Sequence, residues 1–450
     1  MAYRMLSKES MQVHNLIKAG DVAGVRLYHE LSDPDRQSVI KALSDEGHAK
    51  FTSLVKISRD AVFRMGQGSF LHVAKTGRIK TPLYIIDERC VEENMRILRY
   101  VKDRTGCRIL HALKAYASFA TFGVMTPYLD GVCASGLHEA RLGREEFGKE
   151  VHTFGAAYKK TEIRNIIGFS DFIIFNSFHQ FDLYAGRARR GGCSIGIRVN
   201  PGYSQIATPM YDPCAPCSRL GILHEDVARE LPAHRSLIDG LHFHAMCEQN
   251  SGVLEKVLHS FEKLYGPFIK GLKWVNFGGG HHITRPDYDI EKLIGLINNF
   301  QAKYAVQVYL EPGEASVYHA GVLAASVLDI VKNEMEIAIL DASAEAHMPD
   351  VLLMPYRPDV LGSAEPGVKR HTYRLAGPSC LAGDITGDYS FDAPLERGQR
   401  LIFTDMALYT IVKNTTFNGI GLPDIGVIRR DGTFRVVKRF GYRDYRNRQS

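Results

Sequence analysis

The 450-residue sequence predicts an α/β fold: a (β/α)8 TIM barrel, a C-terminal mostly antiparallel β domain and a small helical N-terminal extension. Between about residues 95 and 325, short apolar strands alternate with amphipathic stretches, which is typical of parallel strands buried on both faces. About eight such units fit a closed barrel better than an open sheet. From about residue 326 the chain changes to strands joined by turns.

The first 75 residues carry apolar positions at helical spacing. Helix signals place a start at Ser32 and stops near Gly20 and Gly47. We expect a small extension that serves packing or supports a dimer. The next segment, TPLYIIDE (81–88), is expected to form a strand, and it could pair into the β domain. The predicted domains are 1–75 (extension), 76–325 (barrel) and 326–450 (β domain).

The barrel strands follow one another with helical stretches between most of them. Helices are expected at 119–129, 137–147 and 159–169, and strands of the β domain at 322–343, 401–410 and 426–440. The predicted barrel strands are RILHALKA (108–115), GVCAS (131–135), VHTFGAA (151–157), DFIIFNS (171–177), SIGIRVNP (194–201), LIDGLHFHAM (237–246), KWVNFGGG (273–280) and VQVYLEPG (306–313).

Composition and charge exclude several functional classes. The net charge of +6 is mild, and the basic tail (429–450) alternates apolar and basic residues, so a strand is expected there rather than a nucleic-acid arm. No apolar run reaches ~18 residues and no signal peptide is visible, so no membrane span is expected. Eight cysteines are too sparse for a disulfide scaffold, which indicates free thiols and a cytoplasmic location. Cys214 and Cys217 form a CxxC without a second ligand pair, so no metal site is expected.

Chemically active residues gather at the carboxyl ends of the predicted strands, where barrel enzymes place their sites. Lys114, His244 and Glu311 each follow a strand, and so does the glycine run 278–280. Each has a structural explanation when taken alone: a snorkelling lysine, a core histidine, a paired carboxylate and a tight turn. Together they describe one ligand with an aldehyde, a phosphate, a flat ring and a basic ring nitrogen. Pyridoxal phosphate (PLP) has all four features.

The motifs HALKAY, VCASGLHEA, LHFHAMCEQ, NFGGGHH, LEPGEA, AGPSCLAGD and FTDMALYT resemble, in this order, the barrel-type PLP decarboxylases of ornithine, arginine and diaminopimelate. Within that group the chain is more similar to the carboxynorspermidine/carboxyspermidine decarboxylases. The stretches that carry this similarity include YDPCAPCSRLGI, GGGHHITRPDYDI, AHMPDVLLMPYRP and AGPSCLAGDITGDYSF. The resemblance covers about residues 80–425 and leaves the first 75 residues outside.

The resemblance implies a set of cofactor contacts. Lys114 matches the lysine that bonds to the cofactor's aldehyde, and His244 matches the histidine that stacks on its ring. Glu311 matches the acid that pairs with the ring nitrogen and keeps it protonated. The matching phosphate contacts are Gly278, Gly279, Gly280 and Tyr409.

The resemblance also implies substrate contacts. Cys380 matches the cysteine that returns a proton to the substrate carbon, although an inert buried thiol is the alternative. Asp341 and Asp384 match positions that face substrate amines, with Glu345 as a third candidate; both aspartates could instead be turn or cap residues. In related enzymes the GPSC loop reaches the neighbouring subunit's barrel, so a homodimer with shared sites is expected.

Two positions depart from the amino-acid decarboxylases. Glu314 stands where an arginine usually touches the phosphate, and Cys247 stands where a serine often helps to bind it. The missing arginine argues against a diaminopimelate decarboxylase. The leading interpretation is decarboxylation of carboxyspermidine or carboxynorspermidine. The alternatives are another barrel-type PLP decarboxylase of a basic amino acid, a non-catalytic homologue, and a phosphate-binding barrel enzyme without PLP.

Overall fold

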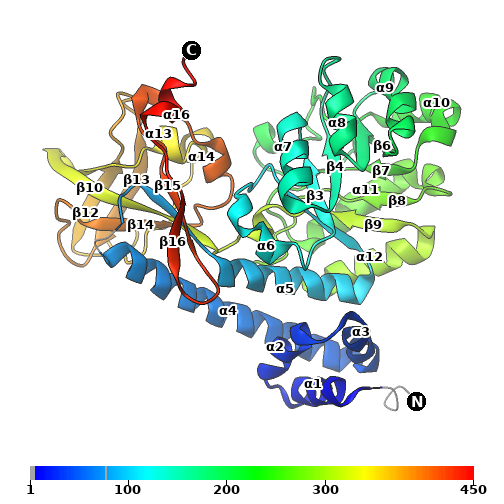
Figure 1. Cartoon of the computed structure of the whole chain (residues 1–450), viewed down its shortest axis with the longest axis horizontal. Coiled ribbons are helices and arrows are strands. Elements are labelled where there is room, and N and C mark those ends of the chain that lie inside the picture. The colour runs from blue at the N-terminus through cyan, green and yellow to red at the C-terminus, as the bar shows by residue number, and fades with distance from the viewer. Residues whose placement is uncertain (1–5, 77–78) are drawn as a thin grey trace. The chain divides into compact units, whose positions relative to one another are not determined.

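The structure is a computed structural model that describes residues 6–76 and 79–450. It contains a closed barrel of eight parallel strands, a separate mostly antiparallel sheet and a helical N-terminal region, which confirms the predicted fold (Figure 1). The chain divides into two compact units. The barrel unit comprises Met1–Asp60, Glu93–Lys114 and Met125–Ser316, and the sheet unit comprises Ala61–Glu92, Ala115–Val124 and Val317–Ser450. The domain bounds expected from the sequence stay a prediction.

The barrel closes because each strand pairs in parallel with the next and the last pairs with the first. Their residues are almost all buried, as expected for strands covered by helices on the outside. Connections between parallel strands need a crossover, and helices supply most of them. The strands are β2 (Arg108–Ala112), β3 (Gly131–Ala134), β4 (Glu150–Phe154), β5 (Phe172–Phe175), β6 (Ser194–Arg198), β7 (Gly240–His242), β8 (Trp274–Asn276) and β9 (Gln307–Leu310).

The barrel interior is filled by side chains around Trp274, the single tryptophan of the chain. Its indole fits because two neighbouring strands carry glycine. A Cβ atom on Gly196 or Gly240 would lie 2.3 Å or 2.1 Å from the ring. The indole N–H donates to the Ser194 hydroxyl at 2.9 Å, so the buried polar atom is satisfied.

The outer helices are amphipathic, and side chains cap several of them, as Asp289 caps α12. The helix expected at 119–129 is shorter than predicted: a 3-10 turn at Phe119–Thr121 leads into a single turn of helix, and Pro127 follows shortly. The helices are α5 (Glu88–Thr105), α6 (Phe122–Met125), α7 (Leu137–Leu142), α8 (Ile163–Phe169), α9 (Phe178–Arg190), α10 (His224–His234), α11 (Ser251–Ile269) and α12 (Ile290–Tyr304).

Four helices form the N-terminal region: α1 (Lys8–Ala19), α2 (Ala23–Glu30), α3 (Asp33–Ala42) and α4 (Asp45–Lys75). The signals at Gly20 and Ser32 are confirmed, since Gly20 caps α1 with φ +80° and the Ser32 side chain caps α3. The stop expected near Gly47 is wrong. That residue lies in the first turn of α4, where it packs on Leu43, the residue that ends α3.

These helices contact the barrel unit through α5. The Tyr28 hydroxyl donates to the Asp103 carboxylate at 2.7 Å, and the Arg36 guanidinium donates to the same group at 3.0 Å. The rings of Phe51 and Tyr100 meet edge to face with centroids 4.8 Å apart. The N-terminal region of the barrel unit is therefore packed against α5 rather than loosely attached.

The sheet has the order β13-β12-β11-β10-β1-β15-β16, with β14 paired to β10. The early strand β1 lies inside the sheet, antiparallel to β10 and parallel to β15. On one face, apolar residues of the second half of α4 pack against it, among them Phe70 and Val73. The strands are β1 (Leu83–Asp87), β10 (Gly321–Asn333), β11 (Met335–Leu340), β12 (His371–Ala376), β13 (Ile385–Phe391), β14 (Arg400–Thr404), β15 (Asp424–Ile428) and β16 (Phe434–Lys438).

Four short helices complete the sheet unit: α13 (Ala344–His347), α14 (Asp350–Leu353), α15 (Thr410–Lys413) and α16 (Tyr442–Arg446). The strand expected at 401–410 ends at Thr404, and Thr410 already begins α15. The basic tail does contain the expected strand, β16. Within the described ranges, no helix has the length and apolar composition needed to cross a membrane.

Candidate active site

Lys114 lies in the turn that follows β2, at the carboxyl end of the barrel strands. The strand ends at Ala112, two residues before the lysine, and the Lys114 side chain is exposed. The preceding N–H, from Leu113, donates to the Cys133 carbonyl at 3.1 Å and fixes the turn beside β3. The apolar run therefore ends before the lysine, whose side chain is exposed after the end of the strand.

Glu311 directly follows β9 and has one tenth of its side chain exposed. Its carboxylate accepts a hydrogen bond from Asn276 Nδ2 at 2.7 Å and lies 3.4 Å from His242 Nε2. Burial alone would raise the pKa of this carboxyl, but His242, His152 and Asn276 outweigh burial and lower it. Glu311 is therefore a carboxylate anion at neutral pH.

His244 follows β7 in a fixed orientation. Its Nδ1 accepts a hydrogen bond from the Gly279 N–H at 2.8 Å, so this nitrogen carries no proton. Burial, and next the positive charge of Lys114, hold the pKa of the imidazole well below its usual value. The arrangement provides a neutral ring beside the lysine amine.

The glycine run after β8 is required by close backbone packing. A Cβ atom on Gly279 would lie 2.4 Å from the Glu311 carbonyl, and one on Gly280 would lie 2.0 Å from the Met246 carbonyl. The Gly278 N–H donates to the Asn276 side chain at 2.8 Å. Gly278 and Gly279 thus use their amides within the protein, while Gly280 donates to no acceptor among the described residues.

Four further residues at this mouth were not identified from the sequence: Cys133, Arg198, His242 and Asn276. Arg198 ends β6, lies 4.6 Å over the Phe154 ring and donates to the His244 carbonyl at 3.2 Å; burial lowers its pKa to about 10. Burial, followed by Glu311, raises the pKa of the Cys133 thiol. Arg198 and Asn276 could have been found from the sequence, because each is a polar residue at the end of an apolar strand, in SIGIR and in WVN.

Asp384 is nine-tenths or more buried and holds two segments of the sheet unit together. Its carboxylate accepts hydrogen bonds from the Ser343 hydroxyl at 2.9 Å and from the Ala344 N–H at 2.7 Å, at the start of α13. It also accepts from the Ser379 N–H at 3.2 Å. Both oxygens are used inside the protein, and they fix the turn that carries the exposed Cys380.

Glu345 lies on α13 and is linked to the same network by its N–H, which donates to Asp384 at 3.3 Å. Burial, followed by the charge of Asp384, raises the pKa of its carboxyl. Its Oε2 atom accepts no hydrogen bond among the described residues. Of the acids predicted to face substrate amines, Glu345 is the one with an unused oxygen.

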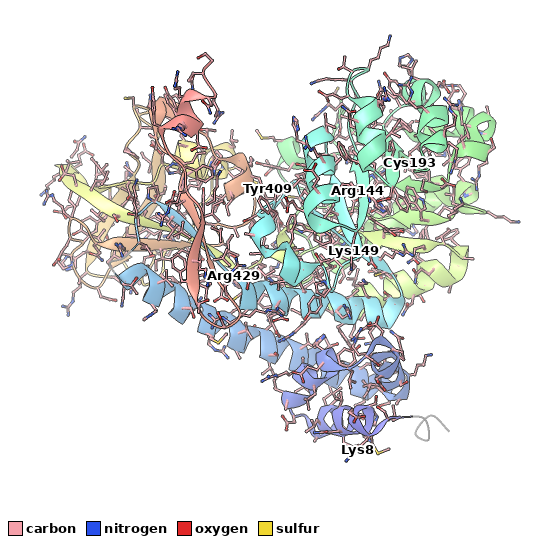
Figure 2. The ribbon with its side chains drawn as sticks, in the orientation of Figure 1. Lys8, Arg144, Lys149, Cys193, Tyr409 and Arg429 are labelled. Carbon is pink, nitrogen blue, oxygen red and sulfur yellow. The ribbon has the colours of Figure 1, made fainter. Side chains whose placement is uncertain are left out.

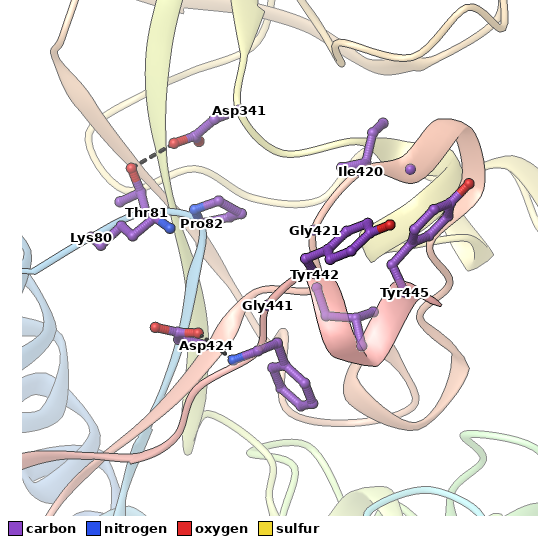
Figure 3. Close-up of a pocket in the computed structure, with 13 residues that line it drawn as sticks. Lys80, Thr81, Pro82, Asp341, Ile420, Gly421, Asp424, Gly441, Tyr442 and Tyr445 are labelled. Atoms are coloured by element: carbon purple, nitrogen blue, oxygen red, sulfur yellow. Dashed lines mark hydrogen bonds between the residues drawn. The ribbon is translucent and has the colours of Figure 1, made fainter. Parts of the chain in front are cut away.

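Asp341 follows β11 and lines a pocket of about 390 Å³ within the sheet unit (Figure 3). Its oxygens accept from the Thr81 hydroxyl at 2.6 Å and the Ser326 N–H at 2.7 Å, and burial raises its pKa. Neither Asp384 nor Glu345 is among the described residues that line this pocket. The hydrogen bonds of Asp341 therefore differ from those that link Asp384 and Glu345 at the start of α13.

Tyr409, labelled in Figure 2, belongs to the sheet unit. Its backbone is strained, since its φ of +53° lies in a region that favours glycine. Its N–H donates to the carbonyl of Ala115, the residue after Lys114 in the chain, at 2.7 Å. Lys413 N–H donates back to the Tyr409 carbonyl at 3.0 Å. These bonds keep the tyrosine in a conformation that it would not adopt alone.

Glu314, which stands in place of an arginine, is buried and paired with His282, whose Nε2 lies 2.9 Å from its carboxylate. This pair links the loop after β9 to the loop after β8. Cys247 is half-buried and is not part of a disulfide. The position where related enzymes carry an arginine is therefore occupied by a histidine–carboxylate pair.

The barrel residues fit PLP by their chemistry. The exposed Lys114 amine suits an aldehyde, the ionised Glu311 suits a protonated ring nitrogen and the neutral His244 ring suits stacking. The N–H of Gly280 suits a phosphate oxygen. Asn276 couples two of these groups, since it donates to Glu311 and accepts from Gly278.

A protein-family model described as "Pyridoxal-dependent decarboxylase, C-terminal sheet domain" matches residues 51–407. The chain is 43% identical over 379 residues to a Campylobacter jejuni protein named carboxynorspermidine/carboxyspermidine decarboxylase, covering 82% of this chain and 98% of that protein. It is 41% identical over 382 residues to a Synechocystis protein named carboxyaminopropylagmatine decarboxylase, covering 84% and 98%.

The fold is also similar to a solved structure. The crystal structure of carboxynorspermidine decarboxylase from Campylobacter jejuni, complexed with norspermidine, superposes with a TM-score of 0.77 at 42% identity. The match covers 82% of this chain and 100% of that one. Several diaminopimelate decarboxylase structures, at 16–20% identity, share the fold with TM-scores of 0.70–0.72.

Proposed function

The chain belongs to the family of pyridoxal-dependent decarboxylases, and from this premise we propose that it removes carbon dioxide from carboxynorspermidine or carboxyspermidine during polyamine synthesis. The observation that carries the proposal is the set at the barrel mouth: an exposed amine on Lys114, an ionised Glu311 and a neutral, oriented His244. The substrate class is supported by the 42–43% identity to the Campylobacter jejuni proteins.

Each barrel residue has one task in this reaction. Bound PLP supplies an electron sink for the electron pair that remains when carbon dioxide leaves. Lys114 would hold the cofactor through its aldehyde. Glu311, whose pKa is lowered, would favour a proton on the ring nitrogen. The neutral His244 ring, oriented by its bond to Gly279, would pack against the cofactor ring.

The sheet unit supplies the remaining tasks. The Cys380 thiol donates a proton to the substrate carbon after carbon dioxide departs, and solvent replaces that proton. Its exposed position supports this role. Glu345 binds a distal ammonium group of the substrate through its unused oxygen. Asp341 and Asp384 remain candidates for amine contacts, but their oxygens already accept internal hydrogen bonds. Tyr409 remains a candidate for the phosphate.

We also propose that the working unit is a homodimer with shared sites, in which Cys380 of one chain serves Lys114 of the other. The test is to mix Lys114→Ala and Cys380→Ala variants, reassemble the dimers and measure turnover. Shared sites restore about one quarter of wild-type activity, because half of the dimers are mixed and each has one intact site. If the turnover of the mixture does not rise above that of the two parent variants, shared sites are contradicted.

The eight cysteines, which form no disulfide, support a reducing, cytoplasmic setting for this enzyme.

The substrate is tested by carbon dioxide release from purified protein supplied with PLP. Carboxynorspermidine, carboxyspermidine, carboxyaminopropylagmatine, ornithine, arginine and diaminopimelate are compared at equal concentration. Release from the first two alone supports the proposal, and their kcat/KM ratio measures the preference for one methylene, which is worth ~1–3 kcal/mol in a pocket. Release from an amino acid instead overturns the substrate assignment.

A second candidate substrate is carboxyaminopropylagmatine, favoured by the 41% identity to the Synechocystis protein. It ends in a guanidinium group, whereas the triamines end in an ammonium group. A carboxylate such as Glu345 can pair with either cation. With a guanidinium group it can form two parallel hydrogen bonds, whereas an ammonium group is a point charge. The same assay separates the two candidates.

A further inference from the structure

Arg59, on α4, is a buried arginine that none of the roles above uses. Its side chain is 1% exposed. Its Nη1 donates to the Thr284 carbonyl at 3.0 Å, and its Nε donates to the Asp60 carboxylate at 2.9 Å. Burying a guanidinium costs free energy unless its donors are satisfied. The bond to Thr284 is the one that leaves the helix and reaches the barrel loops.

Thr284 belongs to the loop after β8 (residues 277–289), which begins with the glycine run. It is completely buried, and its hydroxyl donates to the Ala315 carbonyl at 2.9 Å. Ala315 belongs to the loop after β9 (residues 311–320), which begins with Glu311. Thr284 thus connects the loop that carries the glycines to the loop that carries the ring-nitrogen acid.

Two further contacts join the same loops. The Glu311 N–H donates to the Gly278 carbonyl at 2.8 Å, and His282 Nε2 lies 2.9 Å from the Glu314 carboxylate. Gly278 and Gly280 both adopt positive φ, which glycine tolerates at a high entropic cost of ordering. A loop of this kind holds a ligand tightly only if other contacts fix it beforehand.

We propose that Arg59 is a positioning residue for the cofactor: it anchors the β8 loop through Thr284, and through Thr284 the β9 loop, and so sets the affinity for PLP. The inference rests on the proposed function, because it takes these two loops to hold the cofactor. It also gives α4 a task. The family model begins at residue 51, shortly before Arg59. The helix that extends from the N-terminal region thereby becomes part of the cofactor site's support.

The experiment measures the Kd for PLP by titrating cofactor-free, full-length protein and following the visible absorbance of lysine-bound PLP. The variants are Arg59→Met, Thr284→Val and the double variant. Each single change is expected to weaken binding on the order of tenfold, because each removes one buried hydrogen bond of the same route. The Kd of the double variant is expected to equal that of the single variant that binds PLP more weakly. It is not expected to show the product of the two effects, because both changes interrupt the same route. At saturating PLP, kcat stays within about twofold, since Arg59 touches neither substrate nor cofactor.

Lys56→Met is the matched control. Lys56 is also a cation of α4, and its Nζ donates to the Tyr288 carbonyl at 3.0 Å, at the far end of the β8 loop from the contacts that join the loops. This variant is expected to leave the Kd within about twofold. Arg59→Lys, which keeps the charge and one donor, is expected to recover part of the affinity lost in Arg59→Met.

The outcomes separate the inference from the proposed function. If wild-type protein develops no visible absorbance with PLP, the proposed function fails. Suppose instead that wild-type protein binds PLP, and that Arg59→Met and Thr284→Val lower the melting temperature without changing the Kd for PLP. Arg59 is then only structural, and the inference is wrong. Equal weakening by Lys56→Met also contradicts it. If Arg59→Met does not fold, Arg59→Lys decides: its Kd for PLP is expected to exceed that of wild type, and a wild-type Kd in folded Arg59→Lys contradicts the inference.

Discussion

Lys114 of the barrel unit differs from Asp341 and Asp384 of the sheet unit in how much of its hydrogen-bonding capacity is already used inside the protein. At the barrel mouth, Lys114 is exposed and Glu311 is held as an anion. In the sheet unit, both oxygens of Asp384 and of Asp341 accept hydrogen bonds from their own chain. The difference teaches that a matching motif residue is a better candidate for chemistry when its polar atoms remain available.

The largest expected effect is that of Lys114→Ala, which removes the available amine of the barrel. Turnover should fall by roughly four orders of magnitude or more, because the covalent hold on the cofactor is lost. The measurement is carbon dioxide release together with the visible absorbance of bound PLP. Lys149→Ala, in the same unit, is the control and should keep both. Wild-type turnover in Lys114→Ala would contradict the role of the Lys114 amine in binding the cofactor.

Glu311→Gln should lower kcat by about 10²-fold, because an amide no longer holds the proton on the ring nitrogen. The change also alters the pH dependence of stability. The pKa of Glu311 is lowered in the folded protein, so its carboxylate stabilises the fold above the ordinary value of 4.5, and this contribution is lost as pH falls below it.

The free energy of unfolding of wild type and of Glu311→Gln should therefore converge as the pH drops from about 5 toward 2, because the pKa of Glu311 is lowered from 4.5 to about 2; denaturant titration at about 0.5-unit steps measures this. A difference between the two proteins that does not vary with pH contradicts an ionised Glu311.

Cys380→Ala tests whether the sheet unit supplies the proton that the substrate carbon receives. Carbon dioxide should still be released, about 10²-fold more slowly, and part of the product should be an aldehyde because the carbon is not protonated cleanly. Product analysis by mass spectrometry with carbon dioxide counting checks this. Cys217→Ala, which changes another exposed thiol, should behave as wild type. Clean and fast product formation in the Cys380 variant assigns the proton to another group.

The smallest effects are expected for the acids of the sheet unit, and they should differ in kind. Glu345→Gln should raise KM about tenfold with a smaller change in kcat, because it binds a distal ammonium group. Asp384→Asn should destabilise the protein by about 1–3 kcal/mol, because it weakens a buried carboxylate that accepts several hydrogen bonds. Steady-state kinetics and thermal unfolding of both variants distinguish the roles. A KM effect in Asp384→Asn without destabilisation would return that residue to the substrate.

The order of the strands was predictable, because burial on both faces leaves an apolar run that can be recognised along the chain. The barrel strands at 108–115 and 273–280 were placed in this way, although β2 ends at Ala112. The helix boundary near Gly47 was wrong, because a glycine signal does not show that Leu43 packs beneath it. Local sequence favours an element, while its exact end depends on packing.

Part of the candidate site was also predictable. Lys114, His244, the glycine run and Glu311 were found because strand ends of a barrel converge. Asn276 and His242 were missed, since an amide and a second histidine have many structural uses. Their importance comes from distances to Glu311 that the sequence does not contain.

The fold class, the resemblance to PLP decarboxylases and the residue types at a barrel mouth could be predicted from the sequence alone, because these depend on periodicity and on motifs along the chain. Which polar atoms remain available became visible only in the folded chain. Asp384 meets the Ser343 hydroxyl across 41 positions, and Arg59 meets the Thr284 carbonyl across 225. Hydrogen bonds between segments so far apart form only when the chain has packed, and the sequence pattern does not record them.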